Sequence, residues 1–501
     1  MLRYTTRKLT GIRCLSTISL KNPELLKTGS FINGKWLTND ETFQVNNPAN
    51  LEKLADVTNT SIHGINSAIE SSVDSFKYLK DTTPRIRSQL LLNFYKLMMD
   101  SADDLAKIIT LENGKPLADA LGEVKYSAGF LQWFAEEAPR IYGDTIPSAN
   151  PNNRILTFKQ PVGVVGILTP WNFPSAMITR KFGAAFAAGC TSIVKPACET
   201  PLSALALAHL SKEAGIPDGC FNVVPVDSEK TKIVGEMFCS DKRINKISFT
   251  GSTNIGKILM SQSASSLKRI SFELGGNAPF IVFEDADIDK AVQGAITSKF
   301  RSSGQTCVCA NRLYVHEKVY DEFSSKLAAA VGKLTLGPGL DLSVTHGPLI
   351  HEKALNKVKE HITDAVSKGA KILAGGNAVP ELGPFFHELT VLGDVTHDMK
   401  ISHEETFGPI APIIKFSNDE QVIEMANDTD VGLSGYFFSQ DYSKIFKIGE
   451  ALNVGMVGCN TGAISEASMP FGGVKESGFG REGSKYSIQE YTNIKTIVVG
   501  L

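Results

Sequence analysis

The 501-residue sequence contains no apolar run long enough to cross a membrane. Its longest apolar stretches are strand-sized, well short of the roughly 18 residues that a spanning helix needs. A formal net charge of −2 gives no electrostatic reason to expect a nucleic acid or an anionic membrane as a partner. Eight scattered cysteines make no disulfide framework, and no cysteine–histidine spacing typical of a metal site occurs. These absences favour an ordinary globular protein from a reducing compartment.

The first twenty residues contain no acidic side chain. Apolar and hydroxyl residues there alternate with basic ones, namely Arg3, Arg7, Lys8 and Arg13. This composition resembles a mitochondrial transit peptide, with a matrix-protease site before Ser16. We therefore expect a mitochondrial-matrix protein, and the alternative is a disordered arm on a cytoplasmic one. Mass spectrometry of the mature N-terminus would distinguish the two.

The chain is too long for one compact core, so two large domains are expected. A hairpin is predicted over residues 31–36 and helices from Pro84 to Asn113 and from Asp119 to Arg140. From Pro161 onward, short apolar runs near residues 162–168, 192–194, 221–224 and 246–249 alternate with helical segments. This alternation predicts parallel βαβ units and a Rossmann-like, doubly wound sheet.

A second strand–helix alternation begins at Phe280 and predicts another α/β domain. Two stretches fit neither domain, namely residues 143–160 and the tail 494–499. Both have the pattern of exposed strands, which are liabilities unless another strand covers them. We therefore expect them to pair between subunits.

A glycine-rich turn follows the strand predicted near residue 249, with Gly251 and Ser252 at its start and Gly256 further on. The run nearly matches a phosphate loop, but Ile258 stands where the magnesium-binding hydroxyl is required. The better interpretation is a dinucleotide site, in which the turn brings a pyrophosphate to a helix N-terminus. The glycine pattern alone is weak evidence for a dinucleotide site.

Two further segments carry reactive side chains. Cys307 follows Gly304-Gln305 at the start of a predicted helix, whose backbone N–H groups would stabilise a thiolate and an oxyanion. Glu273 lies between an apolar run and a glycine pair, where burial would make it a general base. The alternatives are an inert buried cysteine and a solvated surface glutamate.

These segments together resemble the aldehyde dehydrogenase superfamily. The motifs occur in the family's order: residues 169–174, 195–201, 249–257, 271–279, 300–309, 404–409 and 470–473. The resemblance covers essentially everything after residue 21 and implies an α/β fold of three parts. These are a Rossmann-like dinucleotide-binding domain over 21–141 and 161–272, an α/β catalytic domain over 273–486, and a small β oligomerisation arm over 142–160 and 487–501.

The resemblance implies that Cys307 attacks an aldehyde, that Asn172 holds the oxyanion, and that Glu273 activates the water that hydrolyses the thioester. It also implies a set of cofactor-binding residues: Thr169, Pro170, Trp171, Lys195, Cys198, Glu199, Gly251, Ser252, Gly256, Leu274, Glu405 and Phe407. Many NAD-specific relatives carry a glutamate where this chain has Cys198, so we expect NADP to be accepted, alongside NAD. Glu199 next to it would partly restore discrimination. No metal is implied.

Within the superfamily the chain is most similar to the succinate-semialdehyde dehydrogenases of 4-aminobutyrate degradation. That likeness implies that Arg180, Arg301 and Ser465 bind the substrate carboxylate, which suits paired arginine donors. Surface arginines paired with acids are the alternative for either arginine alone. Another carboxylated aldehyde such as glutarate semialdehyde stays open, because one methylene gives only roughly 1–3 kcal/mol of discrimination.

The spacing of Cys307 and Cys309 resembles relatives in which a disulfide silences the nucleophile under oxidation. A packing cysteine is the equally weighted alternative. A cysteine hydrolase would need a histidine base, and none of the nine histidines lies in these motifs. A non-catalytic structural protein on this fold is a further alternative. The family implies a homotetramer or a homodimer.

Overall fold

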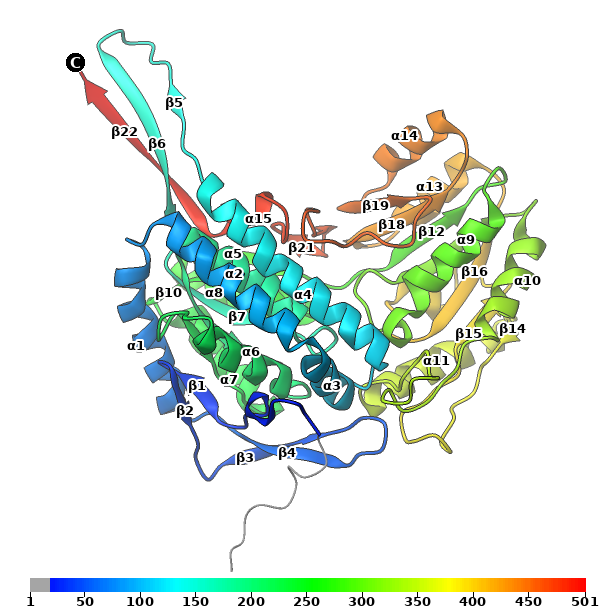
Figure 1. Ribbon diagram of the computed structural model, residues 1–501. Coiled ribbons are helices and arrows are strands. Elements are labelled where there is room, and N and C mark those ends of the chain that lie inside the picture. Colours follow the sequence, from blue (N-terminus) through cyan, green and yellow to red (C-terminus); the bar gives the residue numbers. More distant parts are fainter. Residues whose placement is uncertain (1–18) are drawn as a thin grey trace, which may run out of the picture.

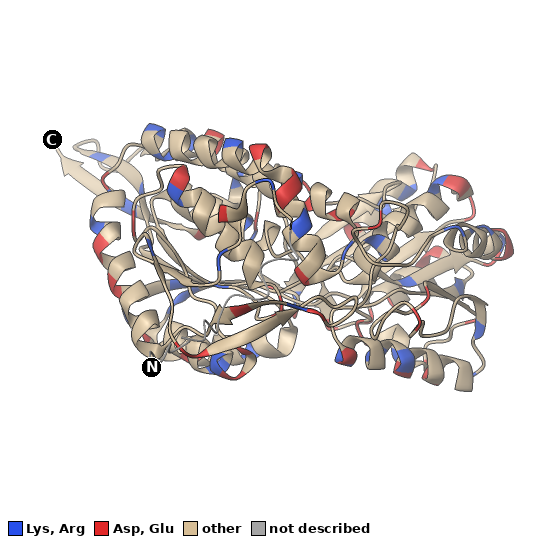
Figure 2. Ribbon diagram, turned by 60° about the horizontal axis from the view of Figure 1, so that its bottom comes forward, with Lys and Arg blue, Asp and Glu red and all other residues tan. Residues whose placement is uncertain are grey.

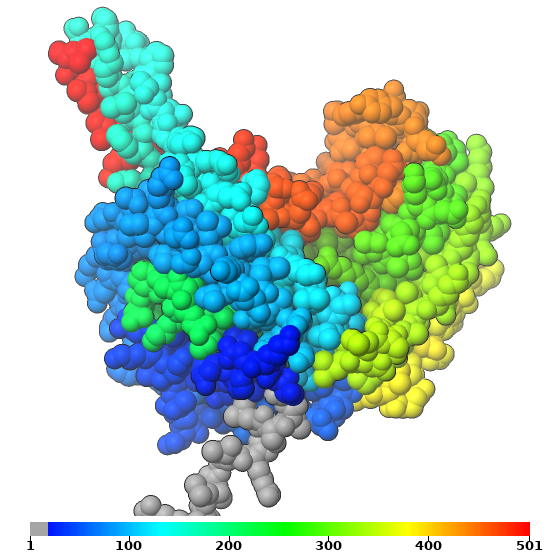
Figure 3. Space-filling view, in the orientation of Figure 1, coloured from blue at the N-terminus to red at the C-terminus, as the bar shows by residue number. Residues whose placement is uncertain are grey.

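The computed structural model describes residues 19–501. Two α/β units lie side by side, and a narrow β arm projects from one of them (Figure 1). The space-filling view shows that this arm stands away from the rest of the molecule (Figure 3). The three parts match the predicted fold class. The predicted transit peptide lies almost entirely outside the described residues.

The first unit contains an eight-stranded sheet with the order β2-β1-β9-β8-β7-β10-β11-β21. Its central strands β9, β8, β7, β10 and β11 are parallel, as predicted, while β2, β1 and β21 pair antiparallel at the edges. The bounds are β1 Ser30–Ile32, β2 Lys35–Leu37, β7 Val164–Leu168, β8 Thr191–Lys195, β9 Phe221–Val223, β10 Ile244–Thr250, β11 Arg269–Glu273 and β21 Gly478–Phe479.

Helices cover both faces of this sheet (Figure 1). Their bounds are α1 Ile62–Leu79, α2 Pro84–Asp100, α3 Ala102–Asn113, α4 Leu117–Glu137, α5 Ala176–Ala188, α6 Pro201–Glu213, α7 Ser228–Ser240, α8 Thr253–Ser263 and α15 Tyr486–Glu490. Local sequence explains their ends: Thr83 caps α2 ahead of Pro84, and Gly114 ends α3 with a φ of 88°. A hairpin of β3 Thr42–Asn46 and β4 Lys53–Thr58 lies beside this unit.

The second unit contains a seven-stranded sheet with the order β14-β15-β16-β13-β12-β18-β19. All its pairs are parallel except that of β14 with β15. The strands are β12 Ala278–Val282, β13 Ala310–His316, β14 Lys371–Ala374, β15 Thr390–Gly393, β16 Ile410–Phe416, β18 Ser434–Phe438 and β19 Met456–Cys459. The helices are α9 Ile288–Ala295, α10 Tyr320–Val331, α11 Glu352–Ser367, α12 Lys400–His403, α13 Asp419–Asn427 and α14 Tyr442–Ala451. Two short strands, β17 Val431–Gly432 and β20 Val474–Lys475, pair with each other.

The two units share the C-terminal part of the chain. Strand β21 belongs to the eight-stranded sheet, although its residues lie inside the range 273–486 predicted for the catalytic domain. Its Phe479 ring lies 5.5 Å from the ring of Phe272 on β11. The chain therefore returns to the first unit before the arm begins.

The arm is a three-stranded sheet of β5 Thr145–Ile146, β6 Asn153–Pro161 and β22 Thr492–Gly500. The tail predicted as an exposed strand forms β22, and the stretch 143–160 contains β5 and most of β6. Strand β22 pairs with β6 along its whole length, and β5 pairs with the other edge of β6. Apolar side chains on β22 remain in solvent, with Ile494 70% and Val498 56% exposed. Pairing between subunits stays a prediction.

Charges of both signs are interspersed along the outer helices (Figure 2). Within residues 19–501 no helix is both long and apolar enough to cross a membrane. In the same residues no group of three or more His, Cys, Asp or Glu side chains is arranged to hold a metal ion.

Candidate active site

A cavity of about 360 Å³ lies where the carboxyl ends of the parallel strands face the second unit. Strand β7 leads into the loop with Asn172, β10 ends at Thr250, and β11 ends at Glu273. The structure brings many of the predicted residues together around this cavity: Pro170, Trp171, Asn172, Gly251, Ser252, Glu273, Leu274, Cys307, Glu405 and Phe407.

The backbone before Cys307 follows an unusual path. Ser302, Ser303 and Gly304 all have positive φ values, of 51°, 56° and 76°. A Cβ at Gly304 would lie 2.2 Å from the carbonyl oxygen of Gly408, so a glycine is needed here. The predicted helix at Cys307 is therefore wrong, because this left-handed segment leads into a turn and then directly into β13. No helix N-terminus is available to the thiol.

The thiol of Cys307 is held in its protonated form by its surroundings. Burial raises its pKa well above the ordinary value, and the charge and hydrogen bonding of Glu273 raise it further. The expected stabilisation of a thiolate by backbone N–H groups is thus outweighed in this state. Glu273 is the carboxylate beside the thiol, and it is 2% exposed.

Hydrogen bonds to both its side chain and its backbone hold Asn172 in place. Its side-chain amide donates to the carbonyl of Gln305 over 3.1 Å, two residues before Cys307. The buried Lys115 donates to the Asn172 carbonyl over 2.6 Å and pairs with Glu123 over 2.7 Å. The amide donor therefore faces the segment that carries Cys307. Sequence reasoning missed Lys115 and Glu123, which no motif marks.

The other end of the cavity has the features of a dinucleotide site. Ser252 caps α8 without a side-chain hydrogen bond to the helix, so its hydroxyl is not used by the cap. A Cβ at Gly256 would lie 2.7 Å from the side chain of Leu274, so this glycine lets the helix approach β11 closely. Glu405 accepts from the N–H of Gly276 over 3.0 Å, and burial raises its pKa to about 7. These polar groups and the glycine cradle fit a bound nicotinamide dinucleotide.

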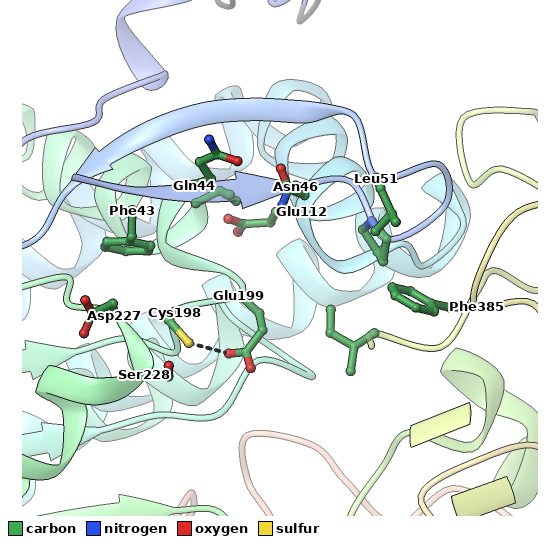
Figure 4. A pocket seen from close by; sticks show the side chains of 13 residues that line it. Phe43, Gln44, Asn46, Leu51, Glu112, Cys198, Glu199, Asp227, Ser228 and Phe385 are labelled. Atoms are coloured by element: carbon green, nitrogen blue, oxygen red, sulfur yellow. Dashed lines mark hydrogen bonds between the residues drawn. The ribbon is translucent and has the colours of Figure 1, made fainter. Parts of the chain in front are cut away.

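Cys198 and Glu199 line a second cavity, also of about 360 Å³, beneath the β3–β4 hairpin. Figure 4 shows the Cys198 thiol donating to the Glu199 carboxylate, over 3.3 Å. Burial and the charge of Glu199 raise the pKa of Cys198 to about 12. Lys195, at the end of β8, lies near them, with its Nζ 3.3 Å from the Thr231 hydroxyl. Thr169, at the start of the loop that contains Asn172, is bonded to this strand end, because its N–H donates to the Lys195 carbonyl.

Arg180 differs from a simple substrate-binding arginine. It is 0% exposed, and its Nη2 donates to Glu273 over 2.8 Å. Its Nε lies 2.5 Å from Glu482, which also pairs with Lys181. Although burial opposes the charge, these carboxylates raise the pKa of Arg180. Glu482 and Lys181 are further residues that sequence reasoning did not find.

Tyr126 connects the three predicted substrate residues. Its hydroxyl bonds to that of Ser465, and its pKa, raised by burial, is opposed by the charges of Arg180 and Arg301. Arg301 is exposed, with its guanidinium 5.2 Å from the centre of the Phe173 ring. The residue set is thus gathered around one tyrosine, although these side chains do not line the cavity of Cys307.

Helix α11 supplies a wall of the cavity that no motif predicted. His351 caps this helix through its Nδ1, and Lys353, Lys357 and Val358 follow on the cavity side. The i, i+4 spacing of the two lysines on an amphipathic helix was the available signal. Lys357 pairs with Glu404. Because the Nδ1 of His351 accepts from the N–H of Ala354, its ring is engaged at the helix start.

Cys309 is 1% exposed, and its thiol lies 3.6 Å from the carbonyl oxygen of Lys299. Both it and Cys307 are free thiols. Cys309 does not line the cavity of Cys307. A disulfide between them, and the packing alternative, both stay predictions.

Comparison with known proteins identifies the family. The model of the aldehyde dehydrogenase family matches residues 36–497. The chain belongs to this family. A succinate-semialdehyde dehydrogenase [NADP(+)] 1 of Schizosaccharomyces pombe is 54% identical over 498 residues, or 99% of each chain. The mitochondrial succinate-semialdehyde dehydrogenase of Rattus norvegicus is 53% identical over 95% of this chain and 91% of the relative.

Solved structures agree with this assignment. The crystal structure of an E. coli NADP-dependent enzyme has a TM-score of 0.95 at 52% identity, over 96% of this chain and 100% of the other. The succinate-semialdehyde dehydrogenase from Burkholderia pseudomallei has the same TM-score at 49% identity, with the same shares covered. The predicted family and aldehyde dehydrogenase fold are confirmed.

Proposed function

We propose that this aldehyde dehydrogenase oxidises succinate semialdehyde to succinate with NADP⁺ or NAD⁺, through a thioester on Cys307. The observation that carries the proposal is the joint placement of Cys307, Glu273 and Asn172 at one cavity whose far end fits a dinucleotide. Relatives that share more than half of their residues with this chain bear the name succinate-semialdehyde dehydrogenase.

Each residue has a chemical task in the reaction. The Cys307 thiol gives its proton to the adjacent Glu273 carboxylate, which releases it to solvent, and the sulfur adds to the aldehyde carbon while the amide of Asn172 donates to the resulting oxyanion. The nicotinamide, when bound, accepts the hydride. Glu273 then takes a proton from water as the water oxygen adds to the thioester carbon, and the C–S bond breaks to release the acid. Glu405 and Phe407 position the nicotinamide end, and Lys195 the adenosine ribose.

Two arginines and a hydroxyl give the specificity for a carboxylated substrate. Arg301, whose charge has no carboxylate partner in the described part of the chain, captures the substrate carboxylate, while Arg180 and Ser465 complete its site. Glutarate semialdehyde is the second candidate substrate, since the site differs by one methylene. At the cofactor, Cys198 leaves room for a 2′-phosphate that a glutamate would repel.

The larger organisation follows the same proposal. The unit around the eight-stranded sheet binds the dinucleotide, the unit around the seven-stranded sheet carries the nucleophile, and the arm joins subunits into a homotetramer or a homodimer. The mitochondrial matrix is the proposed location, on the composition of residues 1–20 and the mitochondrial rat relative. A cytoplasmic location is the alternative.

An absorbance assay of NADPH and NADH formation tests the proposal. Succinate semialdehyde is compared with glutarate semialdehyde and butanal, using the full chain and Cys307→Ala. The Cys307→Ala protein should form no reduced cofactor. Arg301→Ala should raise KM for succinate semialdehyde far more than for butanal. Turnover by Cys307→Ala at the native rate would overturn the mechanism, and an equal effect of Arg301→Ala on both aldehydes would refute the carboxylate site.

A further inference from the structure

Four charged side chains are buried together behind the nucleophile, and we call them the Arg180 cluster: Arg180, Lys181, Glu273 and Glu482. All four are at most 5% exposed. Arg180 is the centre, since it contacts both carboxylates, while Lys181 contacts Glu482 and donates to the Thr250 hydroxyl over 2.6 Å. Two cations and two anions make the cluster neutral. Because the cluster is buried away from water, adding or removing one charge there would leave an uncompensated buried charge and destabilise the protein.

The three guanidinium nitrogens of Arg180 face different groups. Nη2 holds Glu273, and Nε faces Glu482. Nη1 is buried and has no hydrogen-bond partner within the described chain. The guanidinium stacks 4.3 Å from the centre of the Phe471 ring, and it acts on Tyr126, the tyrosine bonded to Ser465, through its charge and a side-chain hydrogen bond. Nη1, which meets neither carboxylate, is therefore the donor placed to bind an anion beside Tyr126.

We propose that the substrate carboxylate and the general base Glu273 share Arg180, so that a bound carboxylate makes Glu273 a stronger base for thioester hydrolysis. This inference rests on the proposed function. The substrate carboxylate accepts a hydrogen bond from Nη1 and draws the guanidinium toward itself. This movement weakens the hydrogen bond from Nη2 to Glu273. Arg180 thus acts on the reaction through Glu273, as a positioning residue as well as a substrate contact. Specificity then arises in the hydrolytic step as well as in binding.

The charged groups around Glu273 determine the sign of the effect. Arg180 on α5 is the cation that contacts it, and Lys181 acts on it electrostatically while pairing with Glu482. Cys307 and Glu405 face it from the second unit. A substrate carboxylate adds a negative charge and competes for the one contacting cation. Both changes favour the protonated form of Glu273, so its carboxylate accepts a proton more readily. Its second oxygen, Oε1, is buried without a partner and is free to receive that proton.

The step itself is balanced without any oxidant. A water O–H bond breaks, its proton goes to Oε1 of Glu273, and its oxygen bonds to the thioester carbon. The C–S bond then breaks, the electron pair returns to sulfur, and the acid leaves. An acyl group without a carboxylate, such as butanoyl, undergoes the same step while Glu273 remains fully held by Arg180.

Hydrolysis of preformed acyl-enzymes isolates this step from hydride transfer. Cys307 is acylated with the mono-p-nitrophenyl ester of succinate or with p-nitrophenyl butanoate, and the decay of each acyl-enzyme is followed by intact-protein mass spectrometry between pH 5 and 9. The succinyl-enzyme should decay faster on the plateau, by about threefold or more, and its acidic limb should lie at higher pH. Coincident profiles in the wild-type protein would overturn the coupling, while acylation of Cys307 would leave the proposed function standing.

Two variants of Arg180 distinguish a coupling between the substrate carboxylate and Glu273 from a purely structural role of this arginine. Arg180→Met should bring the two pH profiles together, and Arg180→Lys, which keeps the cation, should restore part of their separation. Arg243→Met is the control, because it removes an arginine that pairs with Asp241 and contacts neither Glu273 nor the predicted substrate residues, and the acidic limbs of its two profiles should remain separate. Separate limbs in Arg180→Met would overturn the coupling. Absence of NADPH and NADH formation from succinate semialdehyde by the wild type would overturn the proposed function and the coupling together.

Discussion

The carboxylate of Glu273 lies against the thiol of Cys307 and raises its pKa beyond the effect of burial. A negative charge beside a thiol disfavours the thiolate, so removing that charge should lower the pKa of Cys307. Glu273→Gln should therefore react faster with iodoacetamide at pH 7 than the wild type does. The pH at which alkylation is half-maximal should fall as well.

Intact-mass spectrometry of the alkylated protein measures both quantities, with Cys307→Ala subtracting reaction at other cysteines. Glu404→Gln is a suitable control because that carboxylate is partly exposed and paired with Lys357. Equal or slower alkylation of Glu273→Gln would show that the carboxylate does not suppress the thiolate.

Cofactor choice should depend on position 198. Cys198→Glu would place a second carboxylate beside Glu199, where it would repel a 2′-phosphate and accept a hydrogen bond from a ribose hydroxyl. We expect the ratio of kcat/KM for NADP⁺ over NAD⁺ to fall by at least about tenfold, or about 1.4 kcal/mol. Cys198→Ser, which adds no charge, should keep the preference. A wild-type protein that strongly prefers NAD⁺ would contradict the expectation from the start.

Glu112 should make stability depend on pH. It is fully buried, it accepts from the N–H groups of Leu202 and Ser203 over 2.7 and 2.8 Å, and burial raises its pKa to about 8. A carboxyl with a raised folded-state pKa contributes most below its unfolded pKa. Its contribution is lost as the pH rises from about 4.5 to about 8, at up to about 1.4 kcal/mol per pH unit.

Urea unfolding of the wild type and Glu112→Gln at several pH values isolates this contribution. The wild type should lose free energy of unfolding relative to the variant across that window. Outside it, the difference between the two proteins should be constant. A difference that is flat from pH 4.5 to 8 would mean that Glu112 keeps its charge when folded.

Oxidation should reveal whether Cys309 is a switch or a packing residue. Hydrogen peroxide is expected to inactivate the enzyme, and dithiothreitol to restore it, if the two thiols join. Because Cys309 is buried and bonded to the Lys299 carbonyl, the bond would need the segment between them to rearrange. Cys309→Ser should then be inactivated irreversibly. Loss of wild-type activity that dithiothreitol does not restore would favour the packing role.

The arm predicts a defined effect on assembly. Ile494 and Val498 lie on one face of β22 and are both mostly in solvent. Replacing both with aspartate should dissociate the oligomer into smaller species in size-exclusion chromatography with light scattering. Lys495→Asp, on the opposite face, should keep the mass of the wild type. An unchanged mass in the double variant would remove the arm from the interface.

Much of this architecture could be predicted from sequence because local signals agreed with tertiary ones. The continuous apolar run of Val164–Leu168 is typical of a strand that is buried on both faces. Thr83 followed by Pro84 is typical of a helix start, and the helix Pro84–Asp100 begins there. The path at Cys307 could not be predicted, since positive φ at Ser302 and Ser303 is imposed by packing and not by residue type. Glu482, one of the two carboxylate partners of Arg180, was equally hidden, because it lies far along the chain and belongs to no motif.

The segment that starts at Glu482 enters α15 and then β22, so one short piece of chain contributes a carboxylate that shares Arg180 with Glu273 and a strand of the projecting arm. Arg269 also donates to the Thr492 carbonyl over 2.7 Å, which ties the root of the arm to the strand that ends at Glu273. A displacement of the arm would therefore be transmitted through the backbone to Glu273. Substitutions in α15 or at the root of β22 are therefore expected to lower the turnover rate even where the arm itself is intact.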